Sequence, residues 1–396
     1  MPTLMSKYKA SSLNGYVEFQ LPHISHPSFG QVTISGRFPH IQPHLSRPVV
    51  DPSIPSGLIY KYTELVAECG LRPASFERAC NITSTVTCAI QLTLYWNPTL
   101  PLDSKGFTFY AWLLLFAWFF DNALEDGWFS GRLTLRDAQS VHETYIKIMR
   151  RQEMEDQLPE IEGLPNFHGI CKVLERMVSA GVDFMGDDYL EYIEPFVSTF
   201  QVAFLSDDWF TCCRLDKRFS LRTYNAWRQW NCGAEVCLEG QLLVRGIRIS
   251  QNIRRHPIFK RIMTILRANL VWVNDILGAG KDFSSTGPNH PDNELLFRVL
   301  EKGEAIQDVV DDMCFLIGEE LHDLIYLKQA LLDIFGEDEN IVGFLEIIEV
   351  MIDGQFNVYI ESIRYKCNRG YVRILRDGEE KQDDPNRSFG LELSKL

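Results

Sequence analysis

Along most of the chain, apolar side chains recur at every third or fourth position, the spacing that gives an α-helix one buried face. The pattern holds from about residue 57 to residue 367, and short segments rich in Pro, Gly and Asn interrupt it, such as 97–106 and 284–293. Alternating patterns typical of strands are scarce, and residues 31–38 (QVTISGRF) show the best of them. The sequence therefore predicts a single all-α domain over residues 57–367.

The two ends of the chain differ from this domain in composition. Residues 1–56 carry too many prolines for a helical core, so they predict an irregular N-terminal arm. Residues 368–396 are rich in charge and predict a mobile tail. We therefore expect one helical domain with two loosely structured flanking segments.

Charge and cysteine usage narrow the class of partner and the compartment. The net charge of −14 argues against nucleic acid or an anionic membrane as the main partner. The ten cysteines are scattered without CxxC pairs, which is typical of a reduced compartment. The sequence shows no apolar leader, and its longest apolar run is too short to span a bilayer. These features predict a soluble, cytoplasmic protein.

The first candidate for chemistry is the segment FAWFFDNALED at 116–126. Twelve apolar or aromatic residues, from Phe109 to Phe120, precede Asp121. Asp121 and Glu125 are four positions apart, so on a helix both carboxylates project from one face. Carboxylates in an apolar setting are costly unless they are paired or bind a metal. The segment therefore predicts the metal-binding lip of an apolar pocket. One and two helical turns before Asp121, three residues are expected to line its wall: Leu114, Ala117 and Trp118.

The second candidate is VNDILGAGKD at 273–282. Asn274, Gly278 and Asp282 are spaced by four residues and form one stripe along two helical turns. An amide oxygen and a carboxylate suit a hard cation such as Mg²⁺. Lys281 is placed to reach a phosphate. The competing interpretation is an ordinary polar helix end.

Two further segments contain an arginine in an unusual setting. Arg228 lies between Trp227 and Trp230, and the sequence Asn231-Cys232-Gly233 weakens the helix directly after it. Near the end of the domain, Arg364 is followed by Tyr365, and a guanidinium beside a phenol suits contact with phosphate oxygens. Taken alone, each arginine is more often a surface residue.

Taken together and in this order, the four segments resemble those of the class I terpene synthases, and within them the fungal sesquiterpene cyclases. DNALED is similar to the aspartate-rich motif and NDILGAGKD to the second metal motif, (N/D)DxxSxxxE. The resemblance implies a single-domain helical bundle of the isoprenoid synthase type around a central apolar cavity. It also implies three Mg²⁺ ions, with Mn²⁺ as an alternative, and ionisation of a prenyl diphosphate.

The resemblance also implies roles for individual residues. Asp121 and Glu125 would bind metal on one side of the pocket entrance. The second metal motif, on the opposite side, would consist of Asn274, Gly278 and Asp282. Arg228 would sense the diphosphate. Asn231 and Cys232 lie at the helix break that follows it, with Cys232 at the effector position, and both are expected to be catalytic together with Asp121 and Arg228. The diphosphate-binding set is Arg228, Asn274, Lys281, Arg364 and Tyr365.

Several positions depart from the family pattern. Asn122 replaces the second Asp of the first motif, a position that often binds no metal directly. Gly278 replaces the Ser or Thr that binds the third metal, so a hydroxyl ligand is missing. Glu125 and Asp282 keep a carboxylate but change its reach by one methylene group. Activity should survive these changes, with an atypical metal requirement.

The pair Asp187-Asp188, in DDYLE, looks more like a metal motif than DNALED does. The separation from Asn274 decides between them, because 153 positions separate Asp121 from Asn274, whereas 87 separate Asp187 from it. The longer separation is the one that the family accepts. DDYLE is therefore expected to be a decoy.

The expected function is that of a magnesium-dependent sesquiterpene cyclase of secondary metabolism, which converts farnesyl diphosphate to a hydrocarbon or alcohol and releases diphosphate. One alternative is a diterpene cyclase that uses geranylgeranyl diphosphate. A chain-elongating synthase is discounted, since it would need a second aspartate-rich motif at NDILGAGKD. From a different class, a catalytically impaired helical binding or scaffold protein could retain these motifs. The chain is expected to be a monomer or a homodimer.

Overall fold

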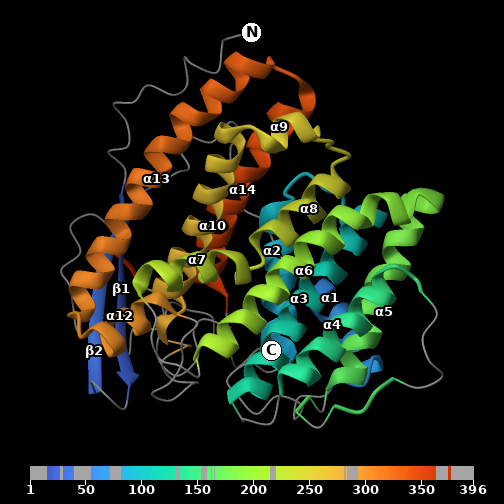
Figure 1. Cartoon of the computed structure of the whole chain (residues 1–396), viewed down its shortest axis with the longest axis horizontal. Helices are drawn as coiled ribbons and strands as arrows, with labels where there is room; N and C mark the ends of the chain where they lie inside the picture. The colour runs from blue at the N-terminus through green and yellow to red at the C-terminus, as the bar shows by residue number, and fades with distance from the viewer. Residues whose placement is uncertain are drawn as a thin grey trace.

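The computed structural model describes most of the domain as helices (Figure 1). The described residues are 16–26, 30–39, 55–71, 82–129, 134–152, 158–161, 163–164, 166–214, 220–280, 282, 293–362 and 373–375. The helices are α1 (Ser56–Glu68), α2 (Ile82–Trp96), α3 (Lys105–Phe129), α4 (Leu135–Met149), α5 (Phe167–Met185), α6 (Tyr189–Arg214), α7 (Leu221–Asn231), α8 (Ala234–Val244), α9 (Gln251–Arg255), α10 (Pro257–Leu277), α12 (Glu294–Lys302), α13 (Ile306–Phe335) and α14 (Glu339–Glu361), with a 3-10 turn, η5, at Gly186–Asp188. The predicted all-α class is confirmed.

Helix α8 runs antiparallel to both α3 and α10. The Tyr110 hydroxyl of α3 donates to the carbonyl of Cys237 on α8 at 3.1 Å, whereas Gly106, one turn earlier, faces Val244. Residue numbers therefore rise along α3 as they fall along α8. The same holds between α8 and α10, because Arg254 pairs with Glu239 before α10 begins and Arg267 pairs with Glu235 along it. The C-terminal ends of α3 and α10 thus point the same way as the N-terminal end of α8.

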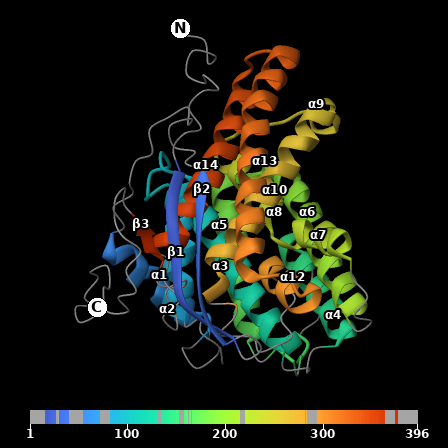
Figure 2. The same cartoon turned by 90° about the vertical axis from the view of Figure 1, so that its left-hand side faces the viewer.

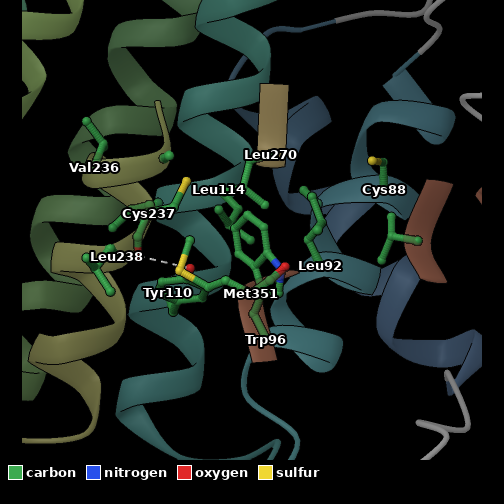
Figure 3. Packing of buried hydrophobic residues seen from close by; sticks show 14 of the residues in the cluster. Cys88, Leu92, Trp96, Tyr110, Leu114, Val236, Cys237, Leu238, Leu270 and Met351 are labelled. Carbon is green, nitrogen blue, oxygen red and sulfur yellow. Dashed lines mark hydrogen bonds between the residues drawn. The ribbon is translucent and has the colours of Figure 1, made fainter. Parts of the chain in front are cut away.

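Apolar side chains of five helices meet between these elements, as Figure 3 shows for one part of the core. The indole nitrogen of Trp96 on α2 donates to the carbonyl of Met351 on α14 at 3.0 Å. Leu114 of α3 and Leu270 of α10 lie beside this pair (Figure 3). All four residues are buried, so they form part of the close-packed apolar core.

A small antiparallel sheet lies against α13 and α14 (Figure 2). Its strands are β1 (Tyr16–His26), β2 (Gly30–Pro39) and β3 (Arg373–Leu375), in the order β2-β1-β3. Ser35 of β2 exchanges hydrogen bonds with the Gln307 side chain of α13, at 3.2 and 2.6 Å. Phe38 packs edge-on against Phe356 of α14, with ring centroids 5.3 Å apart. The sheet is therefore fastened to the helical domain by both polar and aromatic contacts.

The strands of this sheet lie in the two segments that were predicted to be loosely structured, so part of that prediction is wrong. The strand pattern at 31–38 is confirmed, since it falls within β2. The expectation of an irregular arm over 1–56 is wrong for residues 16–26 and 30–39, because alternating apolar residues such as Phe19, Leu21 and Ile34 are buried despite the prolines around them. Within the predicted mobile tail, residues 373–375 form β3. The division into one domain and two flanking segments stays a prediction.

Among the described residues, no helix has both the length and the apolar character needed to cross a membrane.

The contact between α2 and α14 depends on a missing side chain, which gives a first prediction. A Cβ atom at Gly354 would lie 2.7 Å from the Trp96 ring and 3.2 Å from the backbone of Tyr95. We expect Gly354→Ala to lower the free energy of unfolding by about 1–3 kcal/mol. Gly318→Ala on α13 is the matched control, because nothing lies within 4 Å of its Cβ position. That control should be neutral or stabilising by about 0.5–1 kcal/mol. Urea denaturation followed by circular dichroism measures both, and equal midpoints for the two variants would contradict this packing.

Candidate active site

Asp121 lies near the C-terminal end of α3 and is exposed to solvent. Its neighbour Asn122 is buried and donates to the hydroxyl of Thr85 on α2 at 3.3 Å. Asn122 therefore ties α3 to α2, whereas Asp121 is available to a ligand. Glu125 follows one turn later on α3, and its side chain lies outside the described residues.

The competing pair Asp187-Asp188 is exposed in η5, at the corner between α5 and α6. This corner lies beside the other end of α3, because the Lys105 ammonium group donates to the carbonyl of Asp183 at 2.9 Å. Lys105 begins α3, and the rise of an α-helix places it about 24 Å from Asp121. The pair is thus remote from the Asp121 end of α3.

The helix break predicted at Asn231-Cys232-Gly233 is confirmed. α7 ends at Asn231 and α8 begins at Ala234. Gly233 has φ +67°, the left-handed conformation that glycine adopts without steric cost. The break lies beside the C-terminal part of α3, because α8 runs antiparallel to that helix from this point.

Arg228 is buried one turn before the break, and its guanidinium group joins two elements. It donates to the side-chain oxygen of Asn231 and to the carboxylate of Asp275 on α10, both at 2.8 Å. Asp275 has no exposed surface. Burial raises the pKa of Asp275, and the guanidinium of Arg228 opposes that shift. A buried ion pair therefore joins α7 to α10.

Asp275 is also bonded to the start of α12. Its second carboxylate oxygen accepts from the backbone N–H of Glu294 at 2.6 Å, and its carbonyl accepts from the Asn293 side chain at 2.8 Å. Sequence reasoning missed Asp275, Asn293 and Glu294. Asp275 directly follows Asn274 in the second motif, but contacts to residues 18 or 47 positions away carry no local sequence signal.

The stripe formed by Asn274, Gly278 and Asp282 converges as predicted. A Cβ atom built at Gly278 would lie 3.5 Å from the side-chain oxygen of Asn274 and 3.4 Å from a carboxylate oxygen of Asp282. Both oxygens thus lie near this position, which is not open space, because the backbone carbonyl oxygen of Asn274 lies 2.6 Å from it. Oxygen donors of these two kinds fit a hard divalent cation. In the described part of the chain, no three His, Cys, Asp or Glu side chains gather at one point, so this donor set would need waters or a ligand to complete it.

The C-terminal end of α14 also lies beside Asn274. The Asn274 amide donates to the hydroxyl of Tyr359, two residues before α14 ends at Glu361. Arg364 and Tyr365 follow this helix end in sequence and lie outside the described residues, as does Lys281. Asn274 therefore lies beside the helix that leads, in sequence, to the Arg-Tyr pair.

A second arginine, Arg267 of α10, holds both sides of the helix break. Its guanidinium lies 4.3 Å from the centroid of the Trp230 ring, before the break, and pairs with Glu235, after it. Cys232 lies between them, and desolvation raises the pKa of its thiol. The thiol therefore stays neutral, and the clamp fixes the angle between α7 and α8.

The predicted wall residues lie on α3 below Asp121. Leu114 is fully buried in the interior, whereas Ala117 and Trp118 are half-buried one turn nearer to Asp121. Phe116 and Phe120 pack away from this stripe, against rings of α4 and α6. The aromatic run of α3 therefore has one face, with Phe116 and Phe120, that packs on α4 and α6. The wall residues lie on a different face of the helix, which also carries Asp121.

Comparison with known protein families places these elements in context. Residues 113–323 match the family described as "Terpene synthase family 2, C-terminal metal binding". The matched range contains the Asp121 segment, the helix break and the second motif. It covers more than half of the chain.

Curated relatives match shorter segments. A "(3S,6E)-nerolidol synthase" from Selaginella moellendorffii is 28% identical over 134 residues, which are 34% of this chain and 36% of the relative. A "(1R,4R,5S)-(-)-guaia-6,10(14)-diene synthase" from Fusarium mangiferae is 29% identical over 127 residues, 31% of this chain and 30% of the relative. A relative from Gibberella fujikuroi, named an inactive guaiadiene synthase, is 27% identical over 159 residues, 39% of this chain and 36% of the relative. The match thus spans about a third of each relative's length.

Solved structures share the fold across most of the chain. A variant of cucumene synthase aligns with a TM-score of 0.62 at 15% identity, covering 81% of this chain and 99% of its own. A linalool/nerolidol synthase from Streptomyces clavuligerus aligns with a TM-score of 0.60 at 11% identity, covering 79% and 98%. At this identity the similarity shows the fold alone.

The buried polar cluster makes stability depend on pH. Burial, together with the neighbouring Asp275 and the more distant Asp312, raises the pKa of Glu294 to about 7, against the opposing effects of Trp272 and Arg298. The folded protein keeps this proton up to about pH 7, whereas an unfolded chain releases it near its ordinary pKa of 4.5. Stability from this group is therefore fully present below pH 4.5 and is lost as pH rises through 7.

We expect Glu294→Gln to flatten the decline in unfolding free energy between about pH 4.5 and 7, because the neutral amide does not titrate. Urea unfolding at several pH values measures this slope. Glu301→Gln, at an exposed position on the same helix, is the control and should keep the wild-type slope. An unchanged slope in Glu294→Gln would show that Glu294 is ionised in the folded protein.

Proposed function

This chain belongs to the terpene synthase family, and on that basis we propose that it ionises farnesyl diphosphate with the help of divalent metal ions and cyclises the resulting carbocation. The product would be a sesquiterpene hydrocarbon or alcohol, and diphosphate would be released. The family supports dependence on a divalent metal, and Mg²⁺ is the ion we propose, with three ions per site.

One observation supports this proposal: among the described residues, Asp121, Arg228 and Asn274 lie towards the same end of the helices α3, α7 and α10. Asp121 lies near the C-terminal end of α3, and Asn274 lies near the C-terminal end of α10, which points the same way. Arg228 is at the N-terminal side of the break before α8 and bonds directly to Asp275 beside Asn274. We propose that these residues, which are up to 153 positions apart in sequence, bind one ligand together.

The donor chemistry at this end suits metal ions. Asn274 offers an amide oxygen, Asp282 a carboxylate, and Asp121 an exposed carboxylate, with Glu125 proposed as its partner. Gly278 offers no side-chain donor, so a water would take the place of the family's hydroxyl ligand. When bound, Mg²⁺ ions neutralise charge on the diphosphate and promote its departure.

The basic residues act on the same leaving group. Arg228 is held at the helix break by Asn231 and Asp275, so its guanidinium is oriented before substrate binds. Such preorganised donors stabilise negative charge as it develops, at no cost in reorganisation. We propose that Lys281, Arg364 and Tyr365 complete this set. Local positive charge of this kind allows a protein with net charge −14 to bind an anionic substrate.

The apolar interior would hold the hydrocarbon part of the substrate. A carbocation needs a site that excludes water, and the face of α3 with Leu114, Ala117 and Trp118 supplies apolar and aromatic groups below Asp121. The Trp118 ring could also stabilise positive charge by a cation–π interaction. Cys232, which stays a neutral thiol, would act through its position at the break rather than as a nucleophile.

The names of the relatives favour farnesyl diphosphate as substrate, because nerolidol and guaiadiene are sesquiterpene products. A second candidate function, a helical binding protein without turnover, is favoured by one observation. A relative that matches 39% of this chain is named inactive, and in this chain Gly278 offers no side-chain metal donor. Release of diphosphate from farnesyl diphosphate in the presence of Mg²⁺ separates the two, and parallel incubation with geranylgeranyl diphosphate tests the diterpene alternative.

We predict that Asp121→Ala and Asn274→Ala each lower turnover of farnesyl diphosphate by at least about 100-fold, because each removes an oxygen donor for the ions that stabilise the leaving group. The measurement is diphosphate release together with gas chromatography–mass spectrometry of the volatile products. Asp187→Ala is the matched control, since Asp187 is an exposed carboxylate at the corner beside the Lys105 end of α3, the opposite end of that helix from Asp121. Wild-type turnover in both site variants, or a loss in Asp187→Ala alone, would contradict the proposed site.

A further inference from the structure

We propose that Asn293 is a positioning residue of the metal site, whose side-chain amide holds the Asp282 carboxylate against the C-terminal turn of α10. The inference rests on the proposed function, because it takes Asp282 to be a metal ligand. It concerns a residue outside the motifs that the sequence singled out.

The Asn293 side chain is fully buried and makes three hydrogen bonds. Its nitrogen donates to the carbonyl of Asp275 at 2.8 Å and to a carboxylate oxygen of Asp282 at 2.9 Å. Its oxygen accepts from the backbone N–H of Leu296 at 3.1 Å, which caps the first turn of α12. A primary amide has two N–H donors, and here each has a separate acceptor.

Asp282 lies after the end of α10 at Leu277, in a further helical turn whose backbone bond runs from the Asp282 N–H to the carbonyl of Gly278 at 3.0 Å. That backbone bond places its Cα atom, whereas the side-chain carboxylate is oriented by the bond from Asn293. The Asp282 side chain is one methylene group shorter than that of Glu, so it has less freedom to adjust. The bond from Asn293 fixes the orientation of the carboxylate. Partners of this kind typically change metal affinity by about 10–100-fold.

The same short segment also reaches the sensing arginine. Glu294, the next residue, donates its backbone N–H to Asp275 at 2.6 Å, and the other oxygen of Asp275 binds Arg228. Asn293 and Glu294 therefore contact both the proposed metal ligand and the partner of Arg228. The start of α12 sets the relative position of the metal-binding and diphosphate-sensing residues.

The two roles of Asn293 can be separated by substitution. Ser and Thr are good helix N-caps, so Asn293→Ser and Asn293→Thr keep an acceptor for the N–H of Leu296. Neither hydroxyl can replace an amide that donates to Asp275 and Asp282 at once. A loss of capping alone would change stability and leave metal affinity unaltered, whereas a positioning role predicts a change in metal affinity in a folded protein.

The test is titration calorimetry of the full chain with Mg²⁺ in the presence of inorganic diphosphate, together with urea unfolding. We expect Asn293→Ser and Asn293→Thr to stay folded and to bind Mg²⁺ about 10–100-fold more weakly than wild type. Asp338→Ser, which replaces the N-cap of α14 at the opposite end of that helix from Tyr359, is the matched control and should keep wild-type affinity. Asp282→Ala reports on the ligand itself.

Three outcomes are distinguishable. Weaker Mg²⁺ binding in Asp282→Ala and in either folded Asn293 variant supports the proposal. Weaker binding in Asp282→Ala with wild-type binding in both Asn293 variants overturns the role of Asn293 and leaves the proposed function in place. Wild-type binding in all three variants removes Asp282 from the metal site, and with it both this inference and that part of the proposed function.

Discussion

The buried ion pair between Arg228 and Asp275 is the contact on which this end of the molecule depends. It joins the helix break after α7 to the last turn of α10, and the backbone N–H of Glu294 adds α12 to the same carboxylate. Ion pairs in such an environment add little net stability, because desolvation offsets their attraction, but loss of one partner leaves an unpaired buried charge that costs about 3–5 kcal/mol. We infer that the pair is retained for geometry: it fixes where the guanidinium points.

The apolar packing beneath this pair explains why separate sequence motifs reach one place. α3 and α8 run antiparallel, as do α8 and α10, so the polar ends of α3 and α10 emerge beside the break that begins α8. Arg267 holds Trp230 and Glu235 on the two sides of that break. A few charged side chains thus lie at one end of a mostly apolar bundle. Their local positive charge allows a strongly acidic protein to bind an anion there.

Local patterns in the sequence predicted the elements that depend on local chemistry. The helical period, the glycine at the break and the stripe through Asn274 and Asp282 each follow from spacing or from a single residue type, and the spacing of the motifs separated Asp121 from the decoy at Asp187. Long-range contacts were not predictable in this way. The bond from Asn293 to Asp282 joins residues 11 positions apart, and strands β1 and β2 lie in a proline-rich segment whose burial is decided by α13 and α14.

The central claim is that Asp121, Arg228 and the stripe through Asn274 and Asp282 share one ligand. The most direct measurement is a crystal structure with Mn²⁺ and inorganic diphosphate, in which anomalous scattering locates the ions. We predict metal peaks beside Asp121 and beside the oxygens of Asn274 and Asp282, with the diphosphate in hydrogen-bonding reach of Arg228. Metal and diphosphate bound at Asp187-Asp188, or away from Asn274 and Asp282, would contradict the account.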